Sequence, residues 1–513
     1  MCADLNQVTS SDARLIYVPI LQRLFRRKRA DRSGSSHSWD AETSRDPRPT
    51  GTSSPSLPDE LRSLFDSVYA QATACATEAE FERAIQLYDR AIALAPALAE
   101  PYYKRANVLK SAGRPAEAVA SYDQAIEREP DYAHAYCNRG VVQQSLGRME
   151  EALISYERAI ALQPTDAVAH YNRALLMQEW ARWDEALESY DHAVAIDPQF
   201  ADAQYNRSIL QLFMGDFEPG WRGYEWRWIN AHRLGIGQVR EFTEPRWLGR
   251  EDISGKRLLL YSEAGLGDTL QFCRYATLCK RLGATVILEV QAPLCGLLRS
   301  LEGVSELVSA GSRLPAFDYQ CPLLSLPLAF NTTLDTIPSP SSYLSADRER
   351  VAQWHSRLGE RRRPRVGLVW SGNPRNPLNS RRSIPLGELL GQLPTEFEYF
   401  RLQTEVREPD RVALKSNPSI VSFDDDLLDF ENTAALCKCM DVIVTVDTSV
   451  AHLAGTLGHK TWVLLPHTPD FRWLRDRDDS PWYPSFSLYR QTSPGDWKAV
   501  LDRVAAHLHK DFL

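Results

Sequence analysis

The sequence of 513 residues contains no run of apolar residues long enough to span a membrane, so no transmembrane helix is predicted. Its nine cysteines are scattered and include no CxxC pair, which argues against a zinc site or a disulfide framework and is typical of a cytoplasmic protein. There is no GxGxxG fingerprint and no Walker A loop. The formal net charge of −8 argues against non-specific nucleic-acid binding as the main task.

Residues 1–58 are rich in Ser, Arg, Asp and Pro without a sustained hydrophobic period, which predicts a disordered tail. The exception is the apolar stretch Leu15–Phe25, which four basic residues follow. It is not a signal peptide, because the basic residues come after the apolar stretch and Pro19 interrupts it. A basic tail is favoured over a peripheral membrane contact through residues 15–29, because the apolar stretch is short.

Residues 59–230 repeat with a period of 34 residues. Gly113 and Gly147 mark the turn inside a repeat, with Ala181 and Gly215 at the same phase. Period and pattern are those of tetratricopeptide repeats, which are helix–turn–helix units that stack into a curved α-solenoid with a concave binding face. The other recurring positions are Pro96, Pro130, Pro164 and Pro198; Ala84, Ala118, Ala152 and Ala186; and Tyr88, Tyr122, Tyr156 and Tyr190.

Three asparagines, Asn138, Asn172 and Asn206, share one phase of the repeat, and Lys104 breaks the series. They fall in the first helix of each unit, on the face that usually lines the groove. A row of carboxamides can hydrogen-bond the backbone of an extended segment of an acceptor or partner protein. The alternative is that the row bridges neighbouring repeats, since such contacts also recur at the repeat period.

Four tryptophans lie between Trp221 and Trp247, at the end of the solenoid and in a connector predicted over residues 231–255. Such a density of aromatic side chains is more typical of a packed core than of a ligand site. We therefore expect a rigid junction.

From residue 256 the pattern becomes an alternation of strands and helices, which predicts two Rossmann-like halves, residues 256–360 and 361–513. Ligands in such sheets bind at the carboxyl ends of the strands. The predicted strands are Arg257–Tyr261, Thr285–Val290, Glu306–Ser309 and Asp318–Pro322 in the first half, and Arg365–Trp370, Tyr399–Gln403, Ser419–Phe423, Asp441–Val446 and Thr461–Pro466 in the second.

The segment Val442–Gly458 combines a buried strand with a turn and a helix. Asp447, Thr448 and Ser449 end the apolar run with three residues that favour a helix N-cap. A strand that turns directly into a helix presents backbone N–H groups and the positive end of the helix dipole, which can hold a phosphate. An ordinary crossover with an Asp cap gives the same pattern.

A second turn of this kind follows the first strand, where Gly265 and Gly267 precede Asp268. Glycines allow the backbone to approach a ligand closely. Asp268 is placed either as a helix cap or as a functional carboxylate.

With these motifs, residues from about Phe81 onward resemble bacterial TPR proteins that carry a heptosyltransferase-like (ADP-heptose:lipopolysaccharide type) GT-B glycosyltransferase domain. The TPR block, including Gly215–Trp228, matches the same architecture. The motifs of the α/β region that carry the resemblance are Ser262–Tyr275, Gly367–Pro374, Arg381–Leu386, Val446–Gly455, Leu464–Leu474 and Asp479–Pro484.

The resemblance implies an inverting transferase that takes a sugar from a nucleotide-diphosphate donor without a metal or other cofactor. It implies Asp268 as the general base on the acceptor hydroxyl, and the acceptor is a protein or an envelope glycan that the solenoid recruits. The residues that it assigns to the donor are Ser371, Gly372 and Asn373 beside the ligand; Arg381 or Arg382 on the phosphates; and Asp447, Thr448, Ser449 and His452 at the diphosphate.

One loop departs from the family pattern, because Asn376 and Asn379 stand where relatives carry a His and an Asn-Asp pair. Two alternatives to the leading interpretation therefore stay open: a protein O-glycosyltransferase of the O-GlcNAc-transferase type, and a non-catalytic TPR adaptor. Two D-x-D sequences, Asp424–Asp426 and Asp476–Asp478, are interpreted as an acidic loop and a surface turn rather than metal sites.

Overall fold

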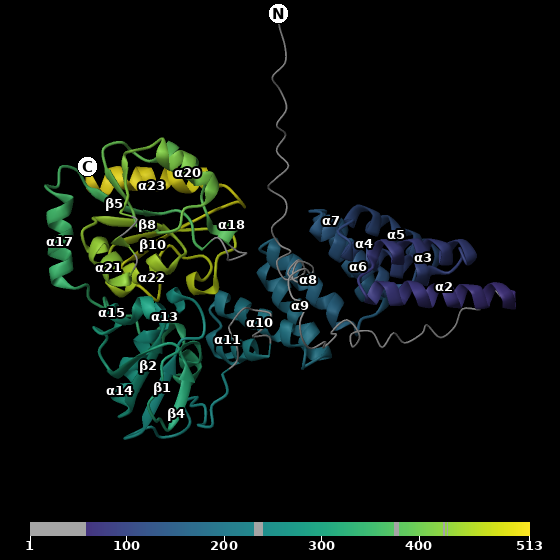
Figure 1. Ribbon diagram of the computed structural model, residues 1–513, viewed down its shortest axis with the longest axis horizontal. Helices are drawn as coiled ribbons and strands as arrows, with labels where there is room; N and C mark the ends of the chain where they lie inside the picture. Colours follow the sequence, from purple (N-terminus) through teal and green to yellow (C-terminus); the bar gives the residue numbers. More distant parts are fainter. Residues whose placement is uncertain (1–57, 230–239, 374–378, 424–425, 428) are drawn as a thin grey trace, which may run out of the picture. The chain divides into compact units, whose positions relative to one another are not determined.

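The computed structural model describes residues 58–229, 240–373, 379–423, 426–427 and 429–513 (Figure 1). The chain divides into two units, residues 1–203 (unit 1) and 204–513 (unit 2), and the division falls inside helix α10 (Ala201–Met214). The predicted tail, apart from Pro58, lies outside the described residues. Among those that are described, no helix has the length and hydropathy needed to cross a bilayer.

Unit 1 is a series of helix pairs that follows the 34-residue period and confirms the predicted tetratricopeptide repeats. The turn inside each pair needs a left-handed backbone, with φ of +76° at Gly113 and +75° at Gly147. Ala181 adopts the same conformation, with φ of 56°, without the freedom of glycine. The helices are α2 (Asp59–Thr77), α3 (Phe81–Leu94), α4 (Ala99–Ser111), α5 (Pro115–Arg128), α6 (Ala133–Ser145), α7 (Met149–Leu162), α8 (Ala167–Glu179) and α9 (Trp183–Ile196).

Small and aromatic residues at fixed phases make the core of unit 1. Every alanine and tyrosine of the two recurring series is buried, so the small side chains let the helices approach while the rings fill the space between them. The tyrosine hydroxyls keep polar partners: that of Tyr156 donates to Gln144 (2.9 Å) and that of Tyr190 to Gln178 (2.9 Å).

A series of arginines repeats beside this core, at Arg105, Arg139 and Arg173. Each guanidinium bonds a serine on the second helix of its own repeat. For Arg139, Nε donates to Ser155 Oγ (3.1 Å) and Nη1 donates to Asp123 of the preceding repeat (2.6 Å). One side chain therefore ties a repeat to its neighbour as well as to itself.

Replacing Arg139 with Met should lower the free energy of unfolding by about 1–2 kcal/mol, because it removes charge-assisted bonds from a mostly buried guanidinium. The matched control is Arg148→Met, at a more exposed arginine whose Glu151 partner lies 3.9 Å away, where the loss should stay below about 0.5 kcal/mol. Urea unfolding of the full chain, followed by far-ultraviolet circular dichroism, measures both. Equal effects would contradict the bridging role.

Two parallel sheets form the centre of unit 2, as the strand–helix alternation predicts. The first has the order β3-β2-β1-β4 and the second the order β10-β9-β8-β5-β6-β7. Their strands are β1 (Arg257–Tyr261), β2 (Thr285–Val290), β3 (Val304–Ser309), β4 (Tyr319–Pro322), β5 (Arg365–Val369), β6 (Glu398–Arg401), β7 (Ile420–Val421), β8 (Val442–Val446), β9 (Thr461–Leu465) and β10 (Phe486–Arg490).

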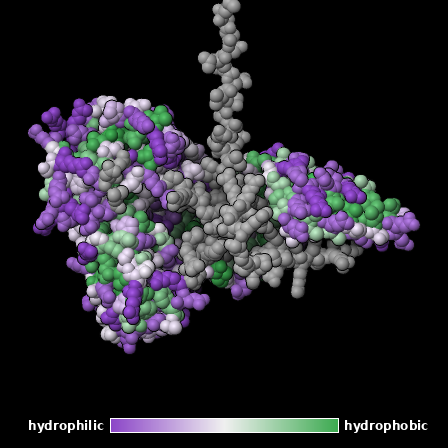
Figure 2. Space-filling model, viewed as in Figure 1, coloured by the Kyte–Doolittle hydropathy of each residue, from purple (hydrophilic) through white to green (hydrophobic). Residues whose placement is uncertain are grey.

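Helices cover both faces of the second sheet, with α20 and α23 on one side and α21 and α22 on the other (Figure 1). Helix α17 packs through Trp354, and its other side chains give it a hydrophilic surface (Figure 2). The helices of unit 2 after α10 are α11 (Phe217–Tyr224), α13 (Leu266–Phe272), α14 (Ala276–Arg281), α15 (Cys295–Leu298), α16 (Leu326–Ala329), α17 (Arg348–Leu358), α18 (Asn379–Arg382), α19 (Leu386–Gln392), α20 (Glu408–Lys415), α21 (Phe430–Lys438), α22 (Ser449–Thr456) and α23 (Trp497–Phe512).

Strand β10 is not among the predicted strands, and β7 is shorter than predicted. Both lie at an edge of the second sheet, where only one neighbour pairs with them. Edge strands carry exposed residues, such as Ser487 in β10, so their apolar pattern is weak.

The strand order places one reversal point in each sheet. In the second sheet, the chain runs outward from β5 through β6 and β7, and outward in the other direction from β8 through β9 and β10. In the first, the neighbours at the reversal are β1 and β4. A crevice for ligands opens at the carboxyl ends of the strands at such a point.

Candidate functional site

The turns that follow β5 and β8 stand side by side, because these two strands pair in parallel at the reversal point. Ser371 and Gly372 follow β5, and Asp447 follows β8. Thr448 is the N-cap of the eight-residue helix α22, and its side chain makes no capping hydrogen bond there. The first N–H groups of α22 are therefore available to an anion.

The loop after β5 is held by two amide side chains. Gln403 accepts from the backbone N–H of Ser371 (3.2 Å), and its Nε2 donates to Ser371 Oγ (2.9 Å). Asn379, which is buried, accepts from the N–H of Gly372 (2.8 Å) and from the hydroxyl of Ser383 (3.0 Å). One of the two departures from the family pattern thus has a structural role, whereas Asn376 lies outside the described residues.

Arg382 brings a positive charge to the same place. Its Nη1 lies 3.9 Å from Asp447 Oδ2, and a Cβ on Gly372 would lie 2.7 Å from its Nη2. The buried Nε of Arg382 has no hydrogen-bond partner among the described residues. Burial raises the pKa of the Asp447 carboxyl, and the charge of Arg382 opposes this rise. Arg381 precedes Arg382 on α18, and both side chains are partly exposed. Asn373, in the loop after β5, is exposed.

His452 lies one turn into α22 and is buried. Its Nδ1 is 2.9 Å from the hydroxyl of Tyr483, and its ring stacks on Trp473 at 5.7 Å between centroids. Burial lowers the pKa of His452 well below its usual value, and the nearby charges of Arg472 and Arg274 lower it further. The imidazole is therefore neutral at physiological pH.

Asp268 lies in the first turn of α13, as predicted, and both of its carboxylate oxygens are engaged. Oδ2 accepts from the N–H of Gly265 (2.8 Å), the N-cap residue of α13. Oδ1 accepts from Nη2 of Arg472. Arg472 also donates to the Gln271 side chain (2.8 Å) and to Asp470 (2.7 Å).

Gly267 is where the two predicted turns meet. A Cβ at this position would lie 2.8 Å from the His452 ring and 3.4 Å from the Ser449 Cα. Only glycine lets α13 approach the start of α22 so closely. The sequence therefore predicted both turns, and the structure brings them together around Asp268, Asp447 and His452.

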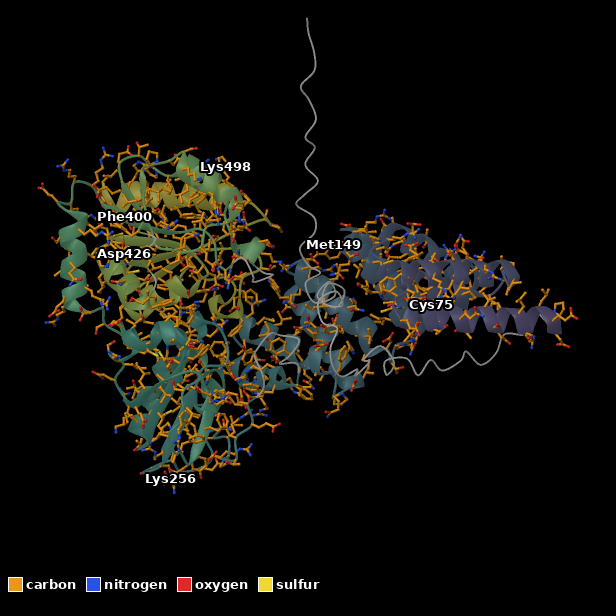
Figure 3. All side chains as sticks on the ribbon, viewed as in Figure 1. Cys75, Met149, Lys256, Phe400, Asp426 and Lys498 are labelled. Atoms are coloured by element: carbon orange, nitrogen blue, oxygen red, sulfur yellow. The ribbon has the colours of Figure 1, made fainter. Side chains whose placement is uncertain are left out.

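Lys256, which precedes β1, marks the opposite end of the first sheet from α13 (Figure 3).

Two residues at this meeting point, Arg472 and Tyr483, had no role assigned from the sequence. Both lie inside motifs that carry the family resemblance. The available signal was an arginine flanked by aromatic residues in the segment that follows strand β9. Its partners could not be inferred, because Arg472 and Asp268 lie 204 residues apart.

The predicted groove residues lie on the first helices of their repeats. Asn138 donates from Nδ2 to Tyr103 (2.9 Å) and to Asn107 (3.3 Å), and Asn172 lies within hydrogen-bond distance of Cys137 (3.5 Å). These partners belong to the preceding repeat, which favours the bridging alternative. Asn206 is partly buried on α10. Peptide binding by this row stays a prediction.

A buried cluster of charges lies beyond the carboxyl ends of β1 and β4 in the first sheet. Arg227 donates to Glu263 (2.9 Å), to Glu225 (2.6 Å) and to Ser325 (2.7 Å). Burial raises the pKa of Glu263 to about 7, against the opposing charge of Arg227. The aromatic segment around it is packed, since Trp221 is buried and contacts Phe272, Phe471 and Trp482 edge-on.

Comparison with known families matches two parts of unit 1. Residues 103–167 and residues 155–188 each match a family model described as tetratricopeptide repeat. A curated relative, Protein FlbA from Caulobacter vibrioides, is 25% identical over 340 residues. The match covers 59% of this chain and 54% of FlbA, so the chain spans about half the length of that relative.

Several solved structures resemble part of the chain. MamA is 21% identical to this chain, and the match covers 32% of this chain and 96% of MamA, with a TM-score of 0.29. PilF of Pseudomonas aeruginosa is 16% identical and covers 36% of this chain and 80% of its own, with a TM-score of 0.32. YrrB, described as a TPR protein with an unusual peptide-binding site, is 20% identical and covers 36% of this chain and 100% of its own, with a TM-score of 0.29.

The raised pKa of Glu263 predicts a pH-dependent stability. The Glu263 carboxyl binds its proton more tightly in the folded chain than in the unfolded chain. Its contribution to the free energy of unfolding is therefore complete below the ordinary pKa of 4.5 and is lost as the pH rises through 7. Between pH 5 and 8, the free energy of unfolding of wild type should fall by about 2–3 kcal/mol relative to that of Glu263→Gln.

Urea unfolding of both proteins at several pH values measures this difference. Glu306→Gln, at a half-exposed carboxylate, is the control for loss of a charge alone. A constant difference between wild type and Glu263→Gln across this range would show that Glu263 does not take up a proton on folding.

Proposed function

We propose that residues 256–513 of unit 2 form a GT-B-type glycosyltransferase domain with two Rossmann-like halves, and that its donor is a nucleoside-diphosphate sugar. The observation that carries the proposal is the group at the β5/β8 reversal point: the uncapped start of α22, with Arg382 beside Asp447. Backbone N–H groups and a guanidinium are the donors that a diphosphate needs. The turn with Asp268 abuts this group through Gly267.

The reaction assigned to this arrangement is a single displacement at the anomeric carbon of the sugar. The acceptor oxygen forms a bond to that carbon, and its proton passes to Asp268. The bond between the carbon and the diphosphate oxygen breaks, and its electron pair leaves with the nucleoside diphosphate. The start of α22 and Arg382 stabilise the charge that develops on the leaving group. His452, neutral and held by Tyr483, lines the same site.

Tetratricopeptide repeats indicate protein partners for unit 1. In the proposed function they recruit the acceptor, which is either a protein or a carrier of an envelope glycan. Asn138, Asn172 and Asn206 are the proposed contacts. Identification of the acceptor distinguishes an O-GlcNAc-type protein glycosyltransferase from an enzyme of envelope-glycan synthesis.

One observation favours a second function, that of a non-catalytic TPR adaptor whose α/β unit binds a nucleotide only as a scaffold. Both oxygens of Asp268 are engaged, by Gly265 and by Arg472. A general base must present a free lone pair to the proton that it accepts, and these two contacts occupy one lone pair on each oxygen. Binding of a donor without transfer to any acceptor would support the adaptor.

The donor site predicts metal-independent binding. A screen of ADP, UDP, GDP and CDP by thermal shift, in buffer with EDTA, should find one nucleotide that raises the melting temperature. Arg382→Gln should weaken its binding by about 1.5–3 kcal/mol, the range for a hydrogen bond to a charged group. The control is Arg411→Gln, at an exposed arginine of the same half, which should bind as wild type does. Binding only with added Mg²⁺ or Mn²⁺ would contradict the metal-free site.

The proposed role of Asp268 as general base predicts that its loss lowers turnover without unfolding the protein. Asp268→Asn retains the side-chain oxygen that caps α13 but removes the proton acceptor. Turnover of the sugar donor should fall by about two to four orders of magnitude. A variant that turns over near the wild-type rate would exclude Asp268 as the base. Glu263, which precedes Asp268 in the sequence and is buried against Arg227, would then be the next candidate for the base.

A further inference from the structure

The segment Asp470–Tyr483, here called the strap, connects the second sheet to the helix that carries the candidate base. It begins after β9 and lies against α13 of the first sheet. Arg472 bonds Asp268 and Gln271, and the carbonyl of Trp482 accepts from the buried Arg274 (2.7 Å). The strap is thus bonded to α13 near its start and to Arg274, just beyond the end of α13, near its own end.

Arg472 lies between the candidate base and the donor turn. Its own guanidinium bonds Asp268, while the next residue, Trp473, stacks on His452 of α22. Its charge reaches the donor turn as well, because it opposes the rise that burial causes in the pKa of Asp447. Burial disfavours the charge of Arg472, but the carboxylates of Asp470 and Asp268 hold its pKa above the ordinary value.

Two further observations point to a ligand near the contact between Arg472 and Asp268. Gln271, which is buried and orients Arg472, has no hydrogen-bond partner for its Nε2 among the described residues. The strap backbone is strained two residues after Arg472, since Leu474 has φ 51° and ψ 177°, a conformation found almost only in glycine. Surrounding contacts must stabilise such a conformation, and strain of this kind clusters at switch regions and ligand clamps.

We propose that Arg472 is shared between the base and the donor: in the ligand-free chain it neutralises Asp268, and a bound diphosphate draws the guanidinium away. This rests on the proposed function of the site. Asp268 Oδ1 then opens to the acceptor proton only when the donor is present, and Arg472 adds a positive charge to the leaving diphosphate. The arrangement reconciles an engaged carboxylate with a role as general base.

The proposal predicts a specific coupling between the two residues. If the Asp268 carboxylate competes with the diphosphate for Arg472, then Asp268→Asn should tighten diphosphate binding, by about three- to tenfold. Arg472→Gln alone should weaken it by about tenfold or more, as expected for a lost charged hydrogen bond. In the Arg472→Gln background, Asp268→Asn should change the affinity by less than about twofold.

Isothermal titration calorimetry with ADP, UDP, GDP and CDP in buffer with EDTA measures the four affinities of this cycle on the full chain. Asp479→Asn is the matched control, since Asp479 belongs to the strap but is 68% exposed and pairs with Arg477 instead. Thermal melts check folding, and Arg472→Met, which also removes the charge, replaces Arg472→Gln with the same expectations if the latter is unfolded.

The outcomes separate this proposal from the one on which it rests. If wild type binds none of the nucleotides, the proposed donor site is wrong. If wild type binds but Asp268→Asn does not tighten binding, the competition for Arg472 is excluded while the donor site stands. Equal tightening with and without Arg472 would show simple relief of repulsion between Asp268 and the phosphates, which also excludes the shared cation.

Discussion

The bond between Arg472 and Asp268 is the interaction on which the site depends. It joins the strap that follows β9 to helix α13, and so fixes the turn after β1 against the turn after β8. Removing the guanidinium from this place would leave Asp268 and Asp470 as two partly buried carboxylates without the cation that pairs with both. Burial lowers the pKa of His452, and the charge of Arg472 lowers it further. One side chain therefore contributes to the electrostatics of both turns.

In unit 1, the polar contacts of the core recur from one repeat to the next. Each repeat buries its alanine and tyrosine. In the three pairs from α4–α5 to α8–α9 an arginine also reaches a serine of its own repeat, and two of these arginines reach an aspartate of the repeat before. Because contacts of this kind recur at 34 residues, neighbouring repeats support one another, and the stack needs no long-range connections. A surface built in this way can present recurring side chains to a protein partner without changing its core.

The sequence predicted most of the fold because its periodicities are local. The repeat period and the apolar runs of β1, β5 and β8 are visible within short windows, and so are the turns with Asp268 and Asp447. The edge strand β10 was not predicted, because only one neighbour supports it. Arg472, Tyr483 and the cluster around Arg227 could not be assigned, since their partners lie far away in the sequence. Asn379 was read as a departure from a family pattern, and the structure gives it a structural role in the loop after β5.

The central claim is that a nucleoside diphosphate binds at the β5/β8 reversal point and engages Arg382 and the start of α22. A crystal structure of the full chain, grown in EDTA and soaked with the nucleotide that stabilises it most, tests this directly. The account predicts the diphosphate within hydrogen-bond distance of the Ser449 N–H and of Arg382, with Arg472 turned from Asp268 toward it. A nucleotide bound elsewhere, or bound there with Arg472 still on Asp268, would contradict the donor site in the first case and the shared cation in the second.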